Sequence, residues 1–194
     1  MGDFMLMIDE IFKRFLIKNR NPINVNNPPK IYTGIGARNP KIAVQEIIKH
    51  ISATLAKKDY ILYSGGTPGC QTCFEKGCDE NHGMKNIFTP WKGYNNSTSP
   101  LVSWGRKLTS VSLPLVTKWE QMAPEIRYIH IRNVQMLLGY NLDKPTKFVI
   151  SWFPYLSYEY GTIMKYAKHF NIPVFNIFIA TDLKYFLDHI LSKA

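Results

Sequence analysis

The sequence predicts an α/β protein with a parallel sheet of about five strands, helices on both faces and an additional N-terminal helix. Two patterns carry this prediction. Short apolar segments alternate along the chain with longer segments whose apolar residues recur at helical spacing. Several short segments end in glycines followed at once by a helical pattern, which is typical of strand-turn-helix units. The chain of 194 residues is long enough for one domain with a substantial core.

The elements follow in order from these patterns. Residues 1–29 read as an N-terminal helix over 1–19 and a connector rich in Pro and Asn. Residues 30–194 form the main domain, with an irregular insertion rich in Asn, Ser and Thr at about 94–120. The expected strands are 30–35, 60–63, 86–90, 147–152 and 173–178, and the expected helices are 40–57, 69–78, 124–138, 158–170 and 181–191.

The segment IYTGIGARNP, residues 31–40, is the first candidate site. It reads as a buried strand that enters a glycine turn and then a helix, with Asn39 as N-cap and Pro40 as first helical residue. A glycine turn at a helix N-terminus offers backbone N–H groups and a favourable dipole to an anion. Arg38 adds a guanidinium, so Gly34, Gly36 and Arg38 form a candidate phosphate site. A glycine turn without a ligand is the alternative.

Charge and composition narrow the class of partner. The chain has 24 basic and 14 acidic residues, a formal charge of +10, which favours polyanionic partners such as nucleotides or nucleic acid. A cationic surface that binds no specific polyanion is the alternative.

No apolar run reaches the ~20 residues of a membrane span. Acidic residues near the N-terminus argue against a secretion signal, and three cysteines cannot form a closed disulfide framework, so we expect a cytoplasmic protein.

Other strand ends carry distinctive residues as well. Ligands of parallel sheets bind outside the carboxyl ends of the strands. A second glycine turn follows the second strand, aromatic and basic residues follow the third, and a Gly-Thr pair opens the helix after the fourth. The side chain of Trp91 or of Trp152 could stack on a base, and packing of these side chains in the core is the alternative. The candidate ligand residues here are Ser64, Gly65, Gly66, Thr67, Trp91, Lys92, Trp152, Gly161 and Thr162.

The order and spacing of several motifs resemble a known superfamily. The motifs are YTGIGAR, SGGTPGCQTCFEKGC, IFTPWKGYN, HIRNVQMLLG, FVISW and GTIMKYAKHFNIPVFN, between about residues 31 and 176. This pattern resembles the Rossmann-like SLOG superfamily, most closely its DprA-like nucleotide-binding proteins, which are often found in phage genomes and are related to the LOG or lysine-decarboxylase-like family. Phage origin would place the protein in the host cytoplasm.

The resemblance implies a nucleotide pocket built from the glycine turns, and it adds Arg132 and Asn133 of the HIRNVQ motif. Arg132 would pair with a phosphate, and Asn133 would bond a ribose or a loop backbone. The alternatives are surface polar residues or a buried tie to a neighbouring loop. Relatives commonly form dimers, so the resemblance and the apolar N-terminal segment favour a homo-oligomer.

The resemblance leaves enzymatic activity open. The branch that activates cytokinins uses a PGGxGTxxE motif with a catalytic Glu, but the matching SYEYGTIMKY has Lys165 at that position. Gln71 likewise stands where the family usually has Asp. Glu159 is a candidate general base close to the Gly-Thr pair, and a solvated glutamate at a helix start is the simpler account.

Cys70, Cys73, Cys78 and His82 form a C-x2-C-x4-C-x3-H spacing that could supply four zinc ligands. Buried thiols packed against the sheet are the favoured interpretation, so no metal is expected.

Three functions follow from these residues. The first is binding of a nucleotide or nucleotide-derived ligand by a sensor, carrier or sequestering protein, which requires no further cofactor. The second is single-stranded DNA binding by a DprA-like recombination mediator, which the positive charge and the aromatic residues favour. The third is a nucleotide N-glycosidic hydrolase or transferase, which the residues at positions 71 and 165 weaken.

Overall fold

The predicted five-stranded parallel sheet is confirmed, and the fold is Rossmann-like α/β. The computed structural model describes residues 29–104, 118–155 and 158–191. Every strand pairing within this part of the chain is parallel, in the order β3-β2-β1-β4-β5. The strands are β1 (Ile31–Gly36), β2 (Ile61–Ser64), β3 (Lys85–Ile87), β4 (Phe148–Trp152) and β5 (Val174–Asn176).

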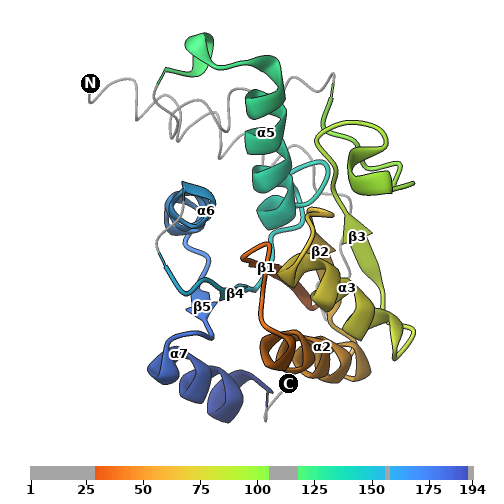
Figure 1. Ribbon diagram of the computed structural model, residues 1–194, viewed down its shortest axis with the longest axis vertical. Helices are drawn as coiled ribbons and strands as arrows, with labels where there is room; N and C mark the ends of the chain where they lie inside the picture. The colour runs from red at the N-terminus through yellow and green to blue at the C-terminus, as the bar shows by residue number, and fades with distance from the viewer. Residues whose placement is uncertain (1–28, 105–117, 156–157, 192–194) are drawn as a thin grey trace.

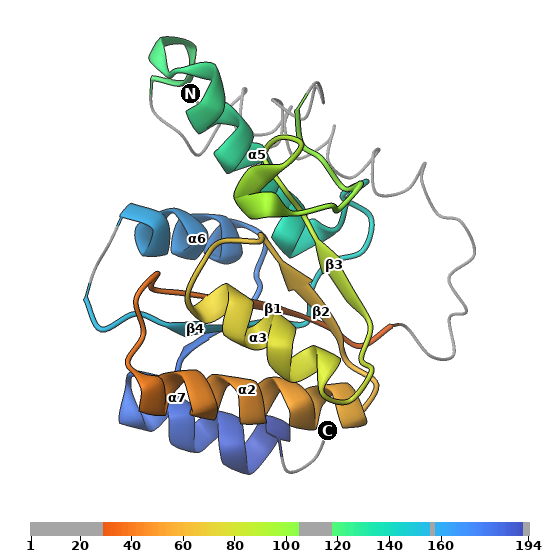
Figure 2. The same cartoon turned by 45° about the vertical axis from the view of Figure 1, so that its right-hand side comes forward.

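Helices cover both faces of the sheet, as Figures 1 and 2 show. One face carries α2 (Ile42–Lys57), α3 (Cys70–Asp79) and α7 (Ala180–Tyr185), which runs on into a π-helical segment, η4 (Phe186–Leu191). The other face carries α5 (Pro124–Leu138) and α6 (Tyr158–His169). Two short 3-10 helices, η1 (Tyr94–Asn96) and η3 (Trp119–Gln121), lie in the connections before α5.

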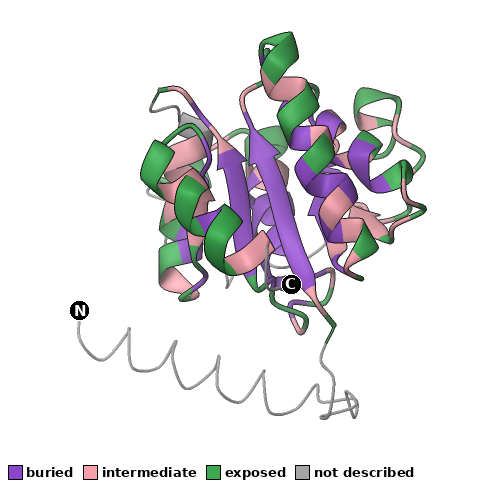
Figure 3. Cartoon of the chain, turned by 90° about the horizontal axis from the view of Figure 1, so that it is seen from below, coloured by how far each residue is buried: buried purple, intermediate pink, exposed green. Residues whose placement is uncertain are grey.

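The core is divided between the two faces because strand side chains alternate. Ile31 and Ile35 of β1 pack with Val134 of α5 on one face, whereas Tyr32 packs with Ile48 of α2 on the other. Figure 3 shows the strands buried between helices whose outer sides are exposed. We therefore refer to the α5/α6 face and the α2/α3/α7 face.

The first predicted helix start is wrong by two residues. α2 begins at Ile42, and its N-cap is Lys41 rather than Asn39. Lys41 has extended backbone angles, φ −60° and ψ 154°, and no side chain caps the helix there. Instead, the Gln45 side-chain amide donates to the Pro40 carbonyl at 3.0 Å, which holds Pro40 just before the helix.

The other boundaries agree to different degrees, and β5 ends at Asn176 rather than at the predicted residue 178. α5 coincides with the predicted helix at 124–138, whereas β3 ends at Ile87, before Thr89 and Pro90, and β1 extends through Gly36. The predicted N-terminal helix, nearly all of the connector and residues 105–117 of the predicted insertion lie outside the described residues. Val102, in the described part of the insertion, forms a parallel bridge with Thr89, which follows β3. Within the described residues, no helix is both long enough and apolar enough to cross a bilayer.

Candidate functional site

The carboxyl ends of the parallel strands meet at one edge of the sheet and define the candidate site. Gly36 of β1 pairs with Trp152 of β4, so the two central strands end together. Two connections leave this edge toward the α2/α3/α7 face: residues 37–41, here called the Arg38 turn, and residues 65–69, here called the Gly66 loop. The chain leaves β1 and β4 toward opposite faces, which is the topological switch point where such sheets bind ligands.

Gly34 and Gly36 lie within β1 rather than in a turn, and packing accounts for both. Their missing side chains face α3. A Cβ at Gly34 would lie 2.6 Å from Cγ of Phe74, and one at Gly36 would lie 2.7 Å from Sγ of Cys70. The two glycines let α3 approach β1, and a ligand-binding role for them stays a prediction.

The Arg38 turn and the Gly66 loop are in direct contact. The Cys70 N–H, at the start of α3, donates to the Ala37 carbonyl at 3.1 Å. Gly69 has a φ of +96°, and a Cβ there would lie 2.2 Å from the Arg38 carbonyl oxygen. Only glycine can adopt this positive φ and also leave room for the Arg38 carbonyl. Because the Arg38 turn and the Gly66 loop pack directly against each other here, they form one continuous surface.

Arg132 anchors the Gly66 loop from the opposite face of the sheet. This α5 residue is only 2% exposed, and its Nη1 donates to the Gly65 carbonyl at 2.8 Å and to Thr67 Oγ1 at 2.9 Å. Its guanidinium also lies over the Tyr94 ring, 5.9 Å from the centroid. This geometry matches the alternative of a buried tie to a neighbouring loop. Contact of Arg132 with a phosphate stays a prediction.

Two further contacts hold the same loop. Gln71 of α3 accepts the Gly65 and Thr67 N–H groups with Oε1, at 2.8 and 3.2 Å. A glutamine here supplies the acceptor oxygen that an aspartate would supply, but without its charge. From the β3 side, the Asn95 side-chain amide donates to the Gly66 carbonyl at 2.7 Å. The Gly66 loop is therefore fixed from three directions.

Sequence reasoning missed Glu75, which lies beneath the loop. Ser64, at the end of β2, donates from Oγ to Glu75 Oε1 at 2.5 Å and accepts the Gly66 N–H at 3.4 Å. Burial raises the pKa of the Glu75 carboxyl, while the hydrogen bond from Ser64 opposes that shift. The spacing in the sequence could have pointed to Glu75, because it follows Gln71 by four residues and both therefore lie on the same side of α3.

The remaining predicted residues differ in exposure. Arg38 and Lys92 are exposed, whereas Asn133 is buried on α5. Trp91 is half-buried and meets the Tyr94 ring edge to face, with centroids 5.2 Å apart. Three more of the predicted ligand residues are also half-buried, namely Trp152, Gly161 and Thr162. Glu159 falls in α6, but its side chain lies outside the described residues.

The cysteine spacing does not produce a metal site in the described part of the chain. Cys70 and Cys78 stand at opposite ends of α3, about 12 Å apart along its axis at 1.5 Å per residue. Burial raises the pKa of the Cys73 and Cys78 thiols and so disfavours the thiolate that binds metals. His82 is exposed, and no group of three or more ligating side chains forms among the described residues.

Two pockets lined by described residues lie at the other edge of the sheet. One, of about 290 Å³, lies between Tyr60, Phe175 and His189, and the other, of about 340 Å³, lies beside Pro29 and Thr146. Lys147, just before β4, lines both. Their walls are mainly apolar and lack a glycine-rich loop and converging polar groups, so we place the candidate site at the carboxyl edge.

Fold and site together define a Rossmann-like α/β protein in which a basic turn and a glycine-rich loop lie against each other at the carboxyl edge of the sheet. Two solved structures are similar to this chain. The structural-genomics protein TM1055 has a TM-score of 0.48 and 18% identity, over 75% of this chain and 72% of that one. DNA processing protein A from Helicobacter pylori, solved for its single-stranded DNA binding mode, has a TM-score of 0.47 and 14% identity, over 77% of this chain and 65% of that one.

No protein-family model matches the chain, and no curated protein matches it either. The resemblance to the SLOG superfamily therefore rests on the sequence motifs.

Proposed function

We propose that this protein binds a nucleotide or a nucleotide-derived ligand at the carboxyl edge of its sheet. The observation that carries the proposal is the fixed Gly66 loop pressed against the Arg38 turn. Arg132, Gln71 and Asn95 hold this loop through hydrogen bonds within the chain, so binding would not require it to be ordered first. The exposed Arg38 guanidinium beside it supplies charge for a phosphate.

The electrostatics of the whole chain support an anionic ligand. The formal charge of +10 favours association with phosphates. On the Arg38 turn both charged residues, Arg38 and Lys41, are basic and exposed. Moderate salt weakens the attraction between these cations and a phosphate. Binding persists in moderate salt when a pocket also holds the rest of the ligand.

The test compares two charge reversals of equal size at opposite edges of the sheet. Arg38→Glu lies at the proposed site, and Lys147→Glu, an exposed lysine just before β4, is the matched control. Thermal unfolding is followed with nucleoside monophosphates, dinucleotides, cyclic nucleotides and a short oligothymidylate. A ligand at ~100 times its Kd adds about 2.7 kcal/mol to the free energy of unfolding of the wild type.

We expect the ligand-induced stabilisation to disappear in Arg38→Glu and to persist in Lys147→Glu, with both apo proteins folded. Equal stabilisation of the wild type and Arg38→Glu would remove the Arg38 turn from the site. Absence of stabilisation by every ligand of the panel would contradict the proposal as a whole.

Single-stranded DNA binding is the second candidate, and the chain's positive charge favours it. The dependence on salt separates the two functions. Binding of a single strand loses affinity with a slope of about −0.7 per phosphate contacted in a plot of log K against log salt. A response to oligothymidylate alone, lost at high salt, would favour DNA; a response to one small nucleotide at both salt concentrations would favour the first proposal.

A further inference from the structure

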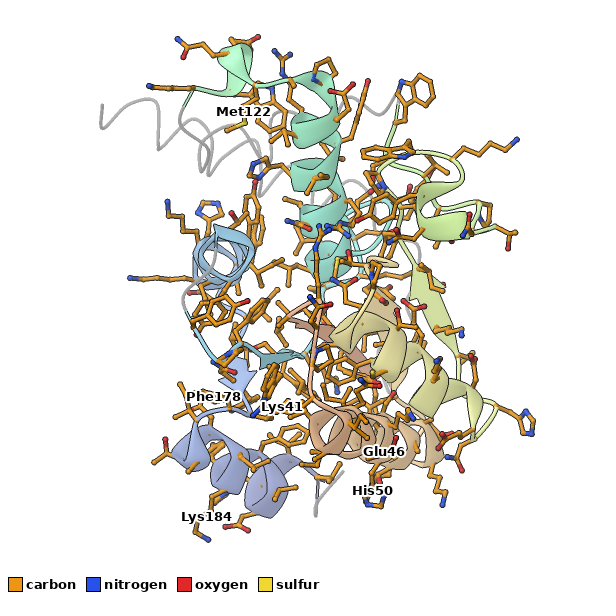
Figure 4. All side chains as sticks on the ribbon, viewed as in Figure 1. Lys41, Glu46, His50, Met122, Phe178 and Lys184 are labelled. Atoms are coloured by element: carbon orange, nitrogen blue, oxygen red, sulfur yellow. The ribbon has the colours of Figure 1, made fainter. Side chains whose placement is uncertain are left out.

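An exposed aromatic ring lies beside the proposed phosphate site. Phe178 lies two residues after the end of β5, and its side chain is 53% exposed, with the adjacent Ile179 44% exposed. In Figure 4, which labels Phe178 and Lys41, the two residues lie next to the starts of α7 and α2. A single exposed apolar side chain is ordinary, so its surroundings must decide whether it has a function.

The backbone that carries Phe178 is fixed by Asn176, which is 5% exposed. Asn176 Oδ1 accepts the Phe153 N–H at 3.1 Å and the Phe178 N–H at 3.3 Å, while its Nδ2 donates to the Phe153 carbonyl at 3.0 Å. The Asn176 N–H in turn donates to Asp182 at 3.0 Å. Phe178 is thus an exposed ring on an anchored loop, which loses little conformational freedom when a ligand binds.

A second ring connects Phe178 to the Arg38 turn. Trp152 meets Phe178 edge to face, with centroids 6.0 Å apart and planes at 82°. The Trp152 carbonyl accepts the Ala37 N–H at 2.9 Å, one residue before Arg38. Trp152 packs toward the α2/α3/α7 face, the same face to which the Arg38 turn leads. The aromatic pair and the exposed cations therefore lie at one end of one face.

We propose that the exposed Phe178 ring, supported edge to face by Trp152, is the base-stacking platform of the nucleotide site, with the phosphate held at the Arg38 turn. This inference rests on the proposed function and adds how the base is recognised. Stacking uses the face that every base possesses, and the neighbouring Ile179 side chain has no hydrogen-bonding group. The ligand is therefore a nucleotide whose base is bound with little regard to its identity.

The experiment compares AMP with ribose 5-phosphate, which keeps the sugar and phosphate but lacks the base. Binding of each to the full chain is measured by titration calorimetry. Phe178→Ala should weaken AMP binding by about 5-fold to 150-fold, the range for loss of one stacking contact. It should leave ribose 5-phosphate binding unchanged.

Matched variants separate stacking from loss of apolar surface. Phe178→Tyr should keep AMP binding near the wild-type level, and Phe178→Leu, which retains apolar area without a ring, should weaken it like Phe178→Ala. Met84→Ala removes an exposed apolar side chain just before β3 and should change nothing. Replacing AMP with thymidine monophosphate should alter the affinity by less than about 10-fold.

The outcomes distinguish the two proposals. If AMP and ribose 5-phosphate both fail to bind, this inference is wrong, and the proposed function fails with it only when every other nucleotide of the panel also fails to stabilise the protein. If AMP binds equally to the wild type, Phe178→Ala and Phe178→Leu, only the stacking platform is excluded. If Phe178→Ala keeps AMP affinity but turns an oligomer into a monomer on size-exclusion chromatography, the ring belongs to a protein interface and this inference is wrong.

Discussion

Individual glycines of this chain serve different purposes, which sequence spacing alone does not separate. Gly34 is enclosed, since an added Cβ would lie within 3.0 Å of three Phe74 ring atoms. Gly161, on α6, has no heavy atom within 4 Å of such a Cβ. The first glycine is needed for packing, and the second is open to replacement.

This difference gives a stability prediction. Gly34→Ala should lower the free energy of unfolding by about 1–3 kcal/mol through overpacking, and Gly161→Ala should raise it by about 0.5–1 kcal/mol because alanine is favoured within a helix. Urea denaturation measures both. Destabilisation by Gly161→Ala, or a neutral Gly34→Ala, would contradict this account. Loss of nucleotide binding in a stable Gly161→Ala would also place Gly161 at the ligand.

Glu75 gives a prediction about pH. Burial raises its folded-state pKa above the unfolded value of about 4.3, so the folded state binds more protons. The contribution of Glu75 to stability is therefore present below about pH 4.3 and is lost as the pH rises through the folded-state pKa. Glu75→Gln should gain stability relative to the wild type between pH 4 and pH 8.

The measurement is urea denaturation of both proteins at several pH values in that range. Glu80→Gln, an exposed glutamate at the end of the same helix, is the control. A stability difference between Glu75→Gln and the wild type that stays constant with pH would show that Glu75 is ionised equally in the folded and unfolded states.

At the scale of elements, the Arg132 side chain attaches α5 to the Gly66 loop. Arg132→Met removes the donor to the Gly65 carbonyl and to Thr67, and it leaves both acceptors buried. We expect a loss of at least about 2 kcal/mol in the free energy of unfolding, because hydrogen bonds from a charged group are strong. Chemical denaturation followed by circular dichroism measures this loss.

Arg127→Met, on the same helix, is the matched control. Arg127 is partly exposed, and it donates to the carbonyls of Met122 and Glu120 in the preceding turn, where water can replace it. Its replacement should cost less than about 1 kcal/mol. Equal losses in the two variants would mean that the tie to the Gly66 loop contributes nothing specific.

The bounds of an element were predictable from the sequence where the periodic spacing of apolar residues and the residues at its ends agreed. α5 has its predicted bounds because apolar spacing, Pro124 at its start and Gly139 after its end agree. The start of α2 was not predictable from Asn39-Pro40, since the Gln45 side chain bonds Pro40 from within the helix and shifts the start to Ile42.

At the scale of the whole molecule, the fold was predictable and the details of the site were not. Alternating strands and helices with glycines at strand ends suffice for a parallel sheet. Gln71 and Asn176 anchor loops through side-chain contacts that depend on how closely elements approach. The nearness of Phe178 to the Arg38 turn depends on β4 lying between β1 and β5. Local patterns do not report such distances.

The central position of β1 has a consequence for how the protein is made. β1 pairs with β2, which follows it closely, and with β4, where Gly36 meets Trp152. A ribosome adding 5–20 residues per second needs on the order of ten seconds to synthesise the chain between them. During that time one edge of β1, which is buried along its whole length in the folded protein, has no native neighbour, so the nascent chain should depend on chaperones or slow docking until β4 emerges.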